Sequence, residues 1–196
     1  MIVLVSGTAH SGKGVVTNTL VEKLGFKEMS FALPIKLWAM NYLGLPVWTV
    51  FSSREEAIRA GAIPTFDNIT FGKTSESRQI LQGLGSMFKE QVDPDFWTKK
   101  LMAKLDVSEL YEDIAISDWR FPREAEMIAE DYDCPKDPVY KIRVVRPNAP
   151  PIEAGAQHKS EVSLTDDMVY DHVFYNVSTR DALEREVEEW ARLKKS

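Results

Sequence analysis

The chain has 196 residues, a net charge of −6 and an ordinary share of hydrophobic residues, 44%, which together are typical of one soluble globular domain. The acidic balance argues against stable nucleic-acid binding, because phosphate contacts require a basic face, and the single cysteine, Cys134, excludes an intrachain disulfide and a thiolate metal centre. No apolar run reaches membrane-spanning length and no basic leader precedes the first strand, so we expect a cytoplasmic protein without membrane contact.

The predicted elements alternate between strand and helix along the chain. We expect strands at 2–6, 26–31, 114–117, 139–145 and 172–175. We expect helices at 12–24, 34–42, 53–60, 76–91, 94–105, 122–131 and 180–194. This alternation favours an α/β domain, with a five-stranded parallel sheet and helices on both of its faces. Within that single domain, about 34–110 forms a mostly helical part that includes a long loop at 61–73, and the proline-rich start of about 146–168 indicates a lid or mobile segment.

The most informative motif is the glycine-rich segment Gly-Thr-Ala-His-Ser-Gly-Lys-Gly at 7–14, which lies between an apolar strand and a helical pattern. Backbone N–H groups of such a loop converge on the phosphates of a nucleotide, and the lysine reaches the terminal oxygens. Glycine at 7 and 12 permits the tight turn and the close approach of anions. The residues that we expect to bind the nucleotide are Gly7, His10, Ser11, Gly12, Lys13, Gly14 and Val15. The alternative is a glycine-rich turn without a ligand.

The motif departs from G-x-x-x-x-G-K-[ST] at its last position, where Gly14 replaces the hydroxyl residue that commonly ligates Mg²⁺. The first hydroxyl after it belongs to Thr17, one helical turn on, which we expect to face away. A Gly-Lys-Gly ending also occurs in adenylate kinases, so the departure favours small nucleotide kinases over GTPases and motor ATPases. The metal would then be held mainly through water and other oxygen ligands.

A second set of polar residues, Asp118-Trp119-Arg120, directly follows the predicted strand 114–117. Ligands of open parallel sheets bind beyond the carboxyl ends of the strands, so this segment belongs at the same rim as the glycine-rich loop. Asp118 could hold Mg²⁺ directly or through water, and Arg120 could bind a phosphate with its planar guanidinium. The alternatives are a helix-capping aspartate and an ordinary surface arginine.

Four residues between 34 and 110 carry weaker signals. Arg78 and Gln82 lie four positions apart and share one helix face, which could bind a phosphate and a base edge or could be solvated. Trp97 is either a core residue or a ring that flanks a nucleobase. Lys36, taken alone, is a surface lysine with a partly covered stem.

Two arginines bracket the end of the strand 139–145. Arg146 is expected at the rim, where it could reach phosphates from the lid, whereas Arg143 is expected to face solvent. His158-Lys159-Ser160-Glu161 follows the proline-rich segment, and no serine–histidine–aspartate spacing indicates a nucleophilic triad.

Taken in order, these segments resemble the bacteriophage-type deoxynucleoside monophosphate kinases, a branch of the P-loop kinase superfamily. The carrying segments are GTAHSGKG (7–14), SFALPIK (30–36), RQILQGLG (78–85), DPDFW (93–97), SDWRFPREAE (117–126), VVRP (144–147) and HKSE (158–161). The resemblance implies a P-loop NTPase fold. It also implies transfer of the γ-phosphoryl group of ATP, with Mg²⁺, to a deoxynucleoside monophosphate, which gives the diphosphate and ADP.

The resemblance also implies roles for single residues. It makes Lys13, Asp118 and Arg120 the catalytic residues, Asp118 the metal contact and Arg146 a lid contact to the nucleotide. The implied acceptor-binding residues are Lys36, Arg78, Gln82, Trp97, Trp119 and Arg120. Three departures from the family stand out: Gly14-Val15 after the lysine, Leu33 where the family commonly has aspartate, and Trp119 in place of a smaller aliphatic residue.

Three other functions remain open at this point. A dephospho-coenzyme A kinase would share the fold but take a different acceptor. A kinase acting on modified bases within DNA is disfavoured by the acidic charge. A nucleotide-binding regulator without activity is favoured by the missing hydroxyl after Lys13. For the kinase we expect small-molecule nucleotide partners and no stable nucleic-acid binding; the sequence leaves a homodimer open.

Overall fold

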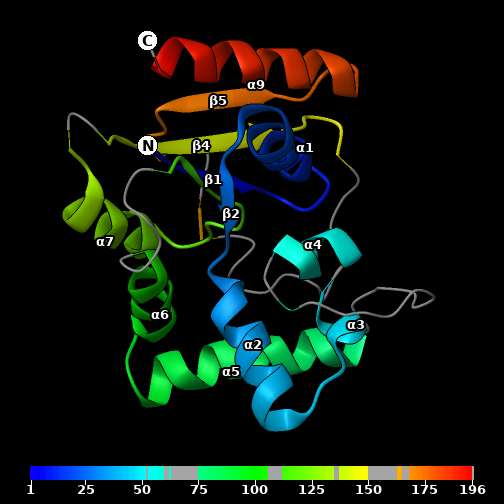
Figure 1. The fold of residues 1–196 in the computed structure, drawn as a ribbon, viewed down its shortest axis with the longest axis vertical. Helices are drawn as coiled ribbons and strands as arrows, with labels where there is room; N and C mark the ends of the chain where they lie inside the picture. The colour runs from blue at the N-terminus through cyan, green and yellow to red at the C-terminus, as the bar shows by residue number, and fades with distance from the viewer. Residues whose placement is uncertain are drawn as a thin grey trace. The chain divides into compact units, whose positions relative to one another are not determined.

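The computed structural model describes residues 1–51, 53–59, 62, 75–105, 112–134, 137–149, 163–164 and 168–195. The chain divides into two compact units. Met1–Met29 together with Glu109–Ser196 form the first, which we call the sheet unit, and Ser30–Ser108 form the second, which we call the helical unit (Figure 1). No described helix is long and apolar enough to cross a membrane.

The sheet unit contains one five-stranded sheet, in the order β2-β3-β1-β4-β5. Its strands are β1 (Ile2–Gly7), β2 (Lys27–Met29), β3 (Ile114–Ile116), β4 (Val139–Val145) and β5 (His172–Tyr175). Every neighbouring pair is parallel, so the predicted five-stranded parallel sheet and the α/β class are confirmed. Because all strands run the same way, their carboxyl ends share one edge of the sheet.

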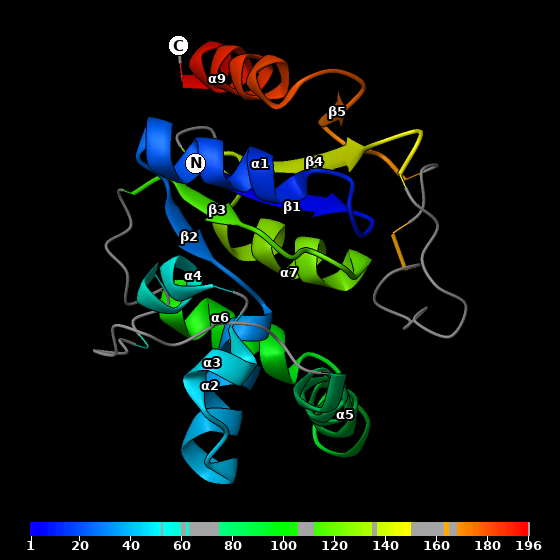
Figure 2. The same cartoon turned by 90° about the vertical axis from the view of Figure 1, so that its right-hand side faces the viewer.

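Helices of the sheet unit cover both faces of the sheet (Figure 2). One face carries α1 (Lys13–Asn18), its π-helical continuation η1 (Thr19–Lys23) and α9 (Arg180–Lys195), and the other carries α7 (Pro122–Tyr132). The predicted helix 12–24 is therefore present, but its second half is π-helical, and Gly25 follows it with φ +74°. A glycine can adopt this left-handed conformation at little cost, which explains the stop.

The alternation of side chains along β1 and β4 separates two layers. Val3, Val5, Ile142 and Val144 belong to the buried core that also contains Val16, Leu20, Val187 and Trp190 of the covering helices. Successive side chains of a strand point to opposite faces, so the residues between them face the α7 side. Ser6 and Arg143 lie on that second face as register partners, at the carboxyl end of the sheet.

The described helices of the helical unit are α2 (Ala32–Leu43), α3 (Val47–Val50), α4 (Arg54–Arg59), α5 (Ser75–Gln91) and α6 (Phe96–Leu105). Rings from α2, α5 and α6 pack together with centroids 4.8–5.6 Å apart, namely Trp38, Tyr42, Phe88, Phe96 and Trp97. The sequence pattern did not predict α3. Helix α6 begins at Phe96 rather than Pro94, because Asp93 accepts the Asp95 N–H at 2.9 Å and forms a turn first. The predicted loop 61–73 lies outside the described residues except for position 62.

Candidate functional site

The glycine-rich loop directly follows β1, and two of its glycines are required by their surroundings. A Cβ on Gly7 would lie 2.8 Å from the carbonyl oxygen of Val144 and would also collide with the Ser11 hydroxyl. Gly12 has φ +103°, and a Cβ there would collide with the side chain of Asn176. Any larger residue at either position would displace the backbone, so these glycines allow the tight approach of the loop to β4 and β5.

Internal hydrogen bonds hold this loop in shape. Asn176 donates its side-chain amide to the Ser11 carbonyl at 3.0 Å, and the Lys13 ammonium donates to the Thr8 carbonyl at 3.0 Å. His10 adopts a left-handed conformation with φ +62°, a strained state for a residue with a side chain. Strain of this kind is concentrated where a loop is shaped for a ligand. Asn176 was not predicted, because the contact joins segments far apart in the chain.

Two hydroxyls near the loop are buried without a hydrogen-bond partner among the described residues, those of Ser11 and Thr17. Thr17 is 2% exposed. The hydroxyl of Thr17 is therefore closed off from solvent, and the expectation that it faces away from the nucleotide stays a prediction. Val15, the last residue of the expected nucleotide-binding set, packs against the core of the sheet unit.

The segment Asp118–Arg120 is fixed from two sides at the end of β3. The Trp119 N–H donates to the Val5 carbonyl at 3.2 Å, which ties the segment to β1. The buried carboxylate of Glu124, in the first turn of α7, accepts the N–H groups of Arg120 and Phe121 at 3.0 Å each. An acidic side chain at this position satisfies helix-end donors and is stabilised by the positive end of the helix dipole. Asp118 and Arg120 are thus attached to an ordered backbone.

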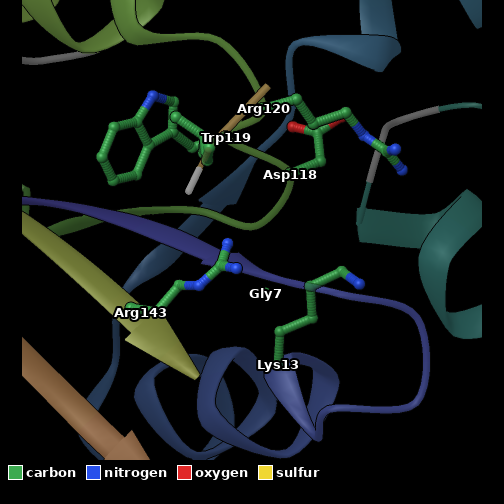
Figure 3. A pocket seen from close by; sticks show the side chains of 7 residues that line it. Gly7, Lys13, Asp118, Trp119, Arg120 and Arg143 are labelled. Atoms are coloured by element: carbon green, nitrogen blue, oxygen red, sulfur yellow. The ribbon is translucent and has the colours of Figure 1, made fainter. Parts of the chain in front are cut away.

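One pocket of the sheet unit brings the loop and this segment together, as predicted from the shared rim of the strands. It is lined by Gly7, Lys13, Asp118, Trp119, Arg120, Arg143 and Leu164. Figure 3 shows the Arg143 guanidinium directed into the space between Lys13 and the Asp118–Arg120 segment. Among the described lining residues, three cations face one carboxylate, in a chain whose net charge is −6. A local positive excess of this kind suits an anionic ligand.

The expectation that Arg143 faces solvent is wrong. Its exposed fraction is 8%, and its guanidinium carbon lies 5.8 Å from the centre of the Tyr170 ring. Its neighbours Ile142 and Val144 face the core of α1 and α9, so Arg143 points to the opposite face, which is also covered. The sequence carried a signal for this, since a charged residue inside a strand covered on both faces is unusual.

Trp119 is buried, with 2% of its surface exposed. Its indole Nε1 donates to the Phe121 carbonyl at 2.8 Å, and its ring packs edge to face against Tyr170 with centroids 5.8 Å apart. Figure 3 shows the indole directed away from Lys13 and Arg143. Trp119 is one of the residues that line the pocket, and a direct role in acceptor binding stays a prediction.

The pocket is compatible with one Mg²⁺ ion. In the described part of the chain, no group of three or more His, Cys, Asp or Glu side chains could hold a metal by itself. Asp118 is the one carboxylate among the described lining residues. Mg²⁺ commonly binds through one or two carboxylates, with phosphate oxygens and water as its remaining ligands. This donor set fits such an ion and agrees with a loop that lacks the usual hydroxyl.

The acceptor candidates of the helical unit lie in different environments. Lys36 is 4% exposed, forms an ion pair with Glu56 and has its ammonium 4.8 Å from the centre of the Phe51 ring. It is therefore no surface lysine. Trp97 is 3% exposed and donates its indole N–H to the Gly85 carbonyl at 3.3 Å. On α5, Arg78 is exposed and Gln82 is half-buried.

The expected lid is described only in part. Arg146, just after β4, is exposed, and its carbonyl accepts the Ala149 N–H at 3.0 Å. It is not among the described residues that line the pocket. The segment His158–Glu161 lies outside the described residues, so its role stays a prediction.

Comparisons with known proteins were made on the whole chain. No protein-family model matches it. A protein of Acanthamoeba polyphaga mimivirus, provisionally named a deoxynucleotide monophosphate kinase, is 29% identical over 188 residues, covering 88% of this chain and 86% of its own length. A solved sugar kinase from Janibacter sp. HTCC2649 aligns over 98% of this chain and 94% of its own, with 14% identity and a TM-score of 0.41, too low to support any assignment. The mimivirus relative confirms, over most of the chain, the resemblance to deoxynucleoside monophosphate kinases that the motifs indicated.

Proposed function

We propose that the chain is a phosphotransferase that moves the γ-phosphoryl group of ATP to a deoxynucleoside monophosphate. The observation that carries this proposal is the pocket in which Lys13, Arg120 and Arg143 face Asp118 beside the glycine-rich loop. Its excess of positive charge suits a polyphosphate. The choice of acceptor rests on the motif resemblance and on the name of the mimivirus relative.

The donor side follows from the loop. ATP phosphates would lie along the backbone of 7–14, with the Lys13 ammonium moving from the Thr8 carbonyl to the β and γ oxygens. Mg²⁺, held by Asp118 directly or through water, would neutralise charge on these oxygens. Arg146 is proposed as a further contact to the donor from the lid.

The roles proposed for acceptor binding come from the resemblance and are taken residue by residue. Arg120 would orient the monophosphate, and Arg78 and Gln82 would bind its phosphate and base edge. Lys36 would contact the acceptor phosphate only if its ammonium were shared between the phosphate and Glu56, or if its ion pair with Glu56 broke. Trp97, buried in the aromatic cluster, would act mainly by shaping the wall of the base site.

The chemistry requires alignment and charge neutralisation more than covalent catalysis. An oxygen of the acceptor monophosphate attacks the γ-phosphorus, the bond from that phosphorus to the bridging oxygen breaks, and its electrons remain on ADP. The attacking oxygen is already ionised near neutral pH, so no general base is needed. Lys13 and the arginines reduce the repulsion between two anions and stabilise the charge of the transferred group.

A second candidate is a nucleotide-binding regulator without transferase activity. Gly14 in place of a hydroxyl residue, together with the buried hydroxyl of Thr17, favours it. Such a protein would bind ATP and transfer its phosphate to no acceptor.

The deciding experiment is Mg²⁺-dependent ADP release from ATP across a panel of deoxy- and ribonucleoside monophosphates, with dephospho-coenzyme A as a further acceptor. Stimulation by one or a few deoxynucleotides, lost on removal of Mg²⁺, would support the proposal and identify the substrate. ATP binding without stimulation by any acceptor would contradict it and favour the regulator. Stimulation by dephospho-coenzyme A alone would indicate the related kinase.

A further inference from the structure

Arg143 occupies a position that an apolar residue would normally fill. It lies on β4 directly opposite Ser6 of β1, and its side chain is on the face of the sheet covered by α7. In the next register step, Gly7 of the loop faces Val144. Arg143 is therefore one residue before the point at which β4 supports the glycine-rich loop, and it enters the pocket from the end of the sheet (Figure 3).

The buried guanidinium of Arg143 adds to a concentration of positive charge in the pocket, which Lys13 and Arg120 also line. A charge that leaves water loses hydration, and a cation close to other cations is also repelled by them. Arg143 is 8% exposed and shares the pocket with Lys13 and Arg120, while its contact with the Tyr170 ring is a weak cation–π interaction at 5.8 Å. A bound anion would lower the repulsion among these cations, so the lining suits a phosphate group.

We propose that Arg143 binds the terminal phosphate of the donor nucleotide, the group that is transferred. This inference rests on the proposed function and assigns a role to a residue that neither the motifs nor the comparisons connect with the nucleotide. The loop amides surround the phosphates nearer the nucleoside, and Lys13 reaches the β and γ oxygens. Arg143 adds a planar set of donors from β4 of the sheet, across the pocket from Asp118 and Arg120 (Figure 3).

The guanidinium stays protonated throughout transfer. As the bond between the γ-phosphorus and the bridging oxygen breaks and the bond to the acceptor oxygen forms, negative charge remains on the three outer oxygens of the moving group. The Arg143 guanidinium, held on a strand, would be in position to stabilise this charge before the reaction begins, and it exchanges no proton.

The test compares the affinities of ATP and ADP, as their Mg²⁺ complexes, by titration calorimetry in wild type and in Arg143→Met. Loss of a charged contact to the terminal phosphate is expected to weaken ATP about 10-fold or more while ADP changes less than about twofold. The matched control is Lys141→Met, because Lys141 is on the same strand two positions earlier and does not line the pocket. It should leave both affinities unchanged.

Equal losses for ATP and ADP, or no loss for either, would overturn the assignment. If Arg143→Met does not fold, Arg143→Lys decides in its place: it keeps the charge but loses the planar guanidinium, so a smaller loss confined to ATP, about threefold, is expected. No selective loss in that variant would also overturn the inference. The proposed function is judged separately in the wild type, where turnover with a deoxynucleotide is required.

Discussion

The sheet unit brings four charged side chains together at the carboxyl end of its strands, whereas the helical unit holds its buried lysine in an ion pair. Lys13, Arg120 and Arg143 come from three different segments and line one pocket with Asp118. In the helical unit, the buried Lys36 is paired with Glu56. Trp97 of the same unit packs edge to face against the rings of Phe88 and Phe96.

The physical origin of this difference is the geometry of the two kinds of layer. The carboxyl ends of parallel strands all lie at one edge of the sheet, so the residues that follow different strands lie close together. Helices that cross one another have no common end, and a polar side chain between them needs a partner or a ligand. This contrast explains why the pocket is assembled from the strand ends of the sheet unit.

The largest expected effect is that of Lys13→Ala on the donor site. Loss of a charge-stabilising donor should reduce kcat at least ~100-fold while the melting temperature stays near that of the wild type. The matched control is Lys23→Ala, which removes an exposed lysine of the sheet unit that pairs with Glu184 and Glu188. Turnover near wild type in a folded Lys13→Ala protein would contradict the donor assignment.

Arg78→Ala tests the acceptor side. If Arg78 binds the monophosphate, the KM for the acceptor should rise about 10-fold, the effect of a lost charged hydrogen bond, with little change in the KM for ATP. Gln79→Ala, an exposed neighbour on α5, serves as control and should change neither. A rise confined to the KM for ATP would contradict the acceptor role of Arg78 and indicate that it binds the donor.

Glu56→Gln separates the structural from the functional role of Lys36. Loss of this partly buried ion pair should lower the free energy of unfolding by about 1–2 kcal/mol, less than for a fully buried pair because Glu56 is partly exposed. If Lys36 also binds the acceptor phosphate, its release should lower the acceptor KM. Denaturant unfolding and steady-state kinetics measure the two effects; an unchanged unfolding free energy would show that the pair does not stabilise the helical unit.

Tyr170 tests whether the position of the Arg143 guanidinium matters for activity, because its ring lies against that group. Tyr170→Leu removes the ring and should reduce kcat about threefold, whereas Tyr170→Phe keeps the ring and should restore it. The rescue by phenylalanine is the decisive readout. Equal losses in both variants would indicate that the hydroxyl matters, or that Tyr170 acts through the fold alone.

The smallest effect concerns His172, a polar residue of the sheet unit packed among Phe174 and Trp190. Burial, with a smaller contribution from the charge of Lys194, lowers the pKa of His172 below its ordinary value of 6.5. The folded state therefore binds this proton more weakly than the unfolded state. Its stability should be full above about pH 6.5 and fall as the pH drops toward the lowered pKa. Melting temperatures at pH 7.5 and 5.5 should differ less in His172→Phe than in wild type; equal differences would exclude His172 as the cause.

Much of the fold followed from local patterns in the sequence. The apolar run 2–6, the helix stop at Gly25 and the proline that begins α7 are features of neighbouring residues, and each marked an element that the structure contains. The short helix α3 was missed because four residues carry too little periodicity to identify one.

The sequence by itself determined the glycine-rich loop, the positions of the five strands and the placement of Asp118 and Arg120 at a strand end, since spacing and turn chemistry act over a few residues. Only the tertiary structure decided the direction of Arg143, the pairing of Lys36 with Glu56 and the bond from Asn176 to the loop. Each of these depends on contacts between segments that are distant in the chain or on which faces of a strand are covered. Neighbouring residues do not determine such contacts, and one of them, the direction of Arg143, adds a positive charge to the pocket.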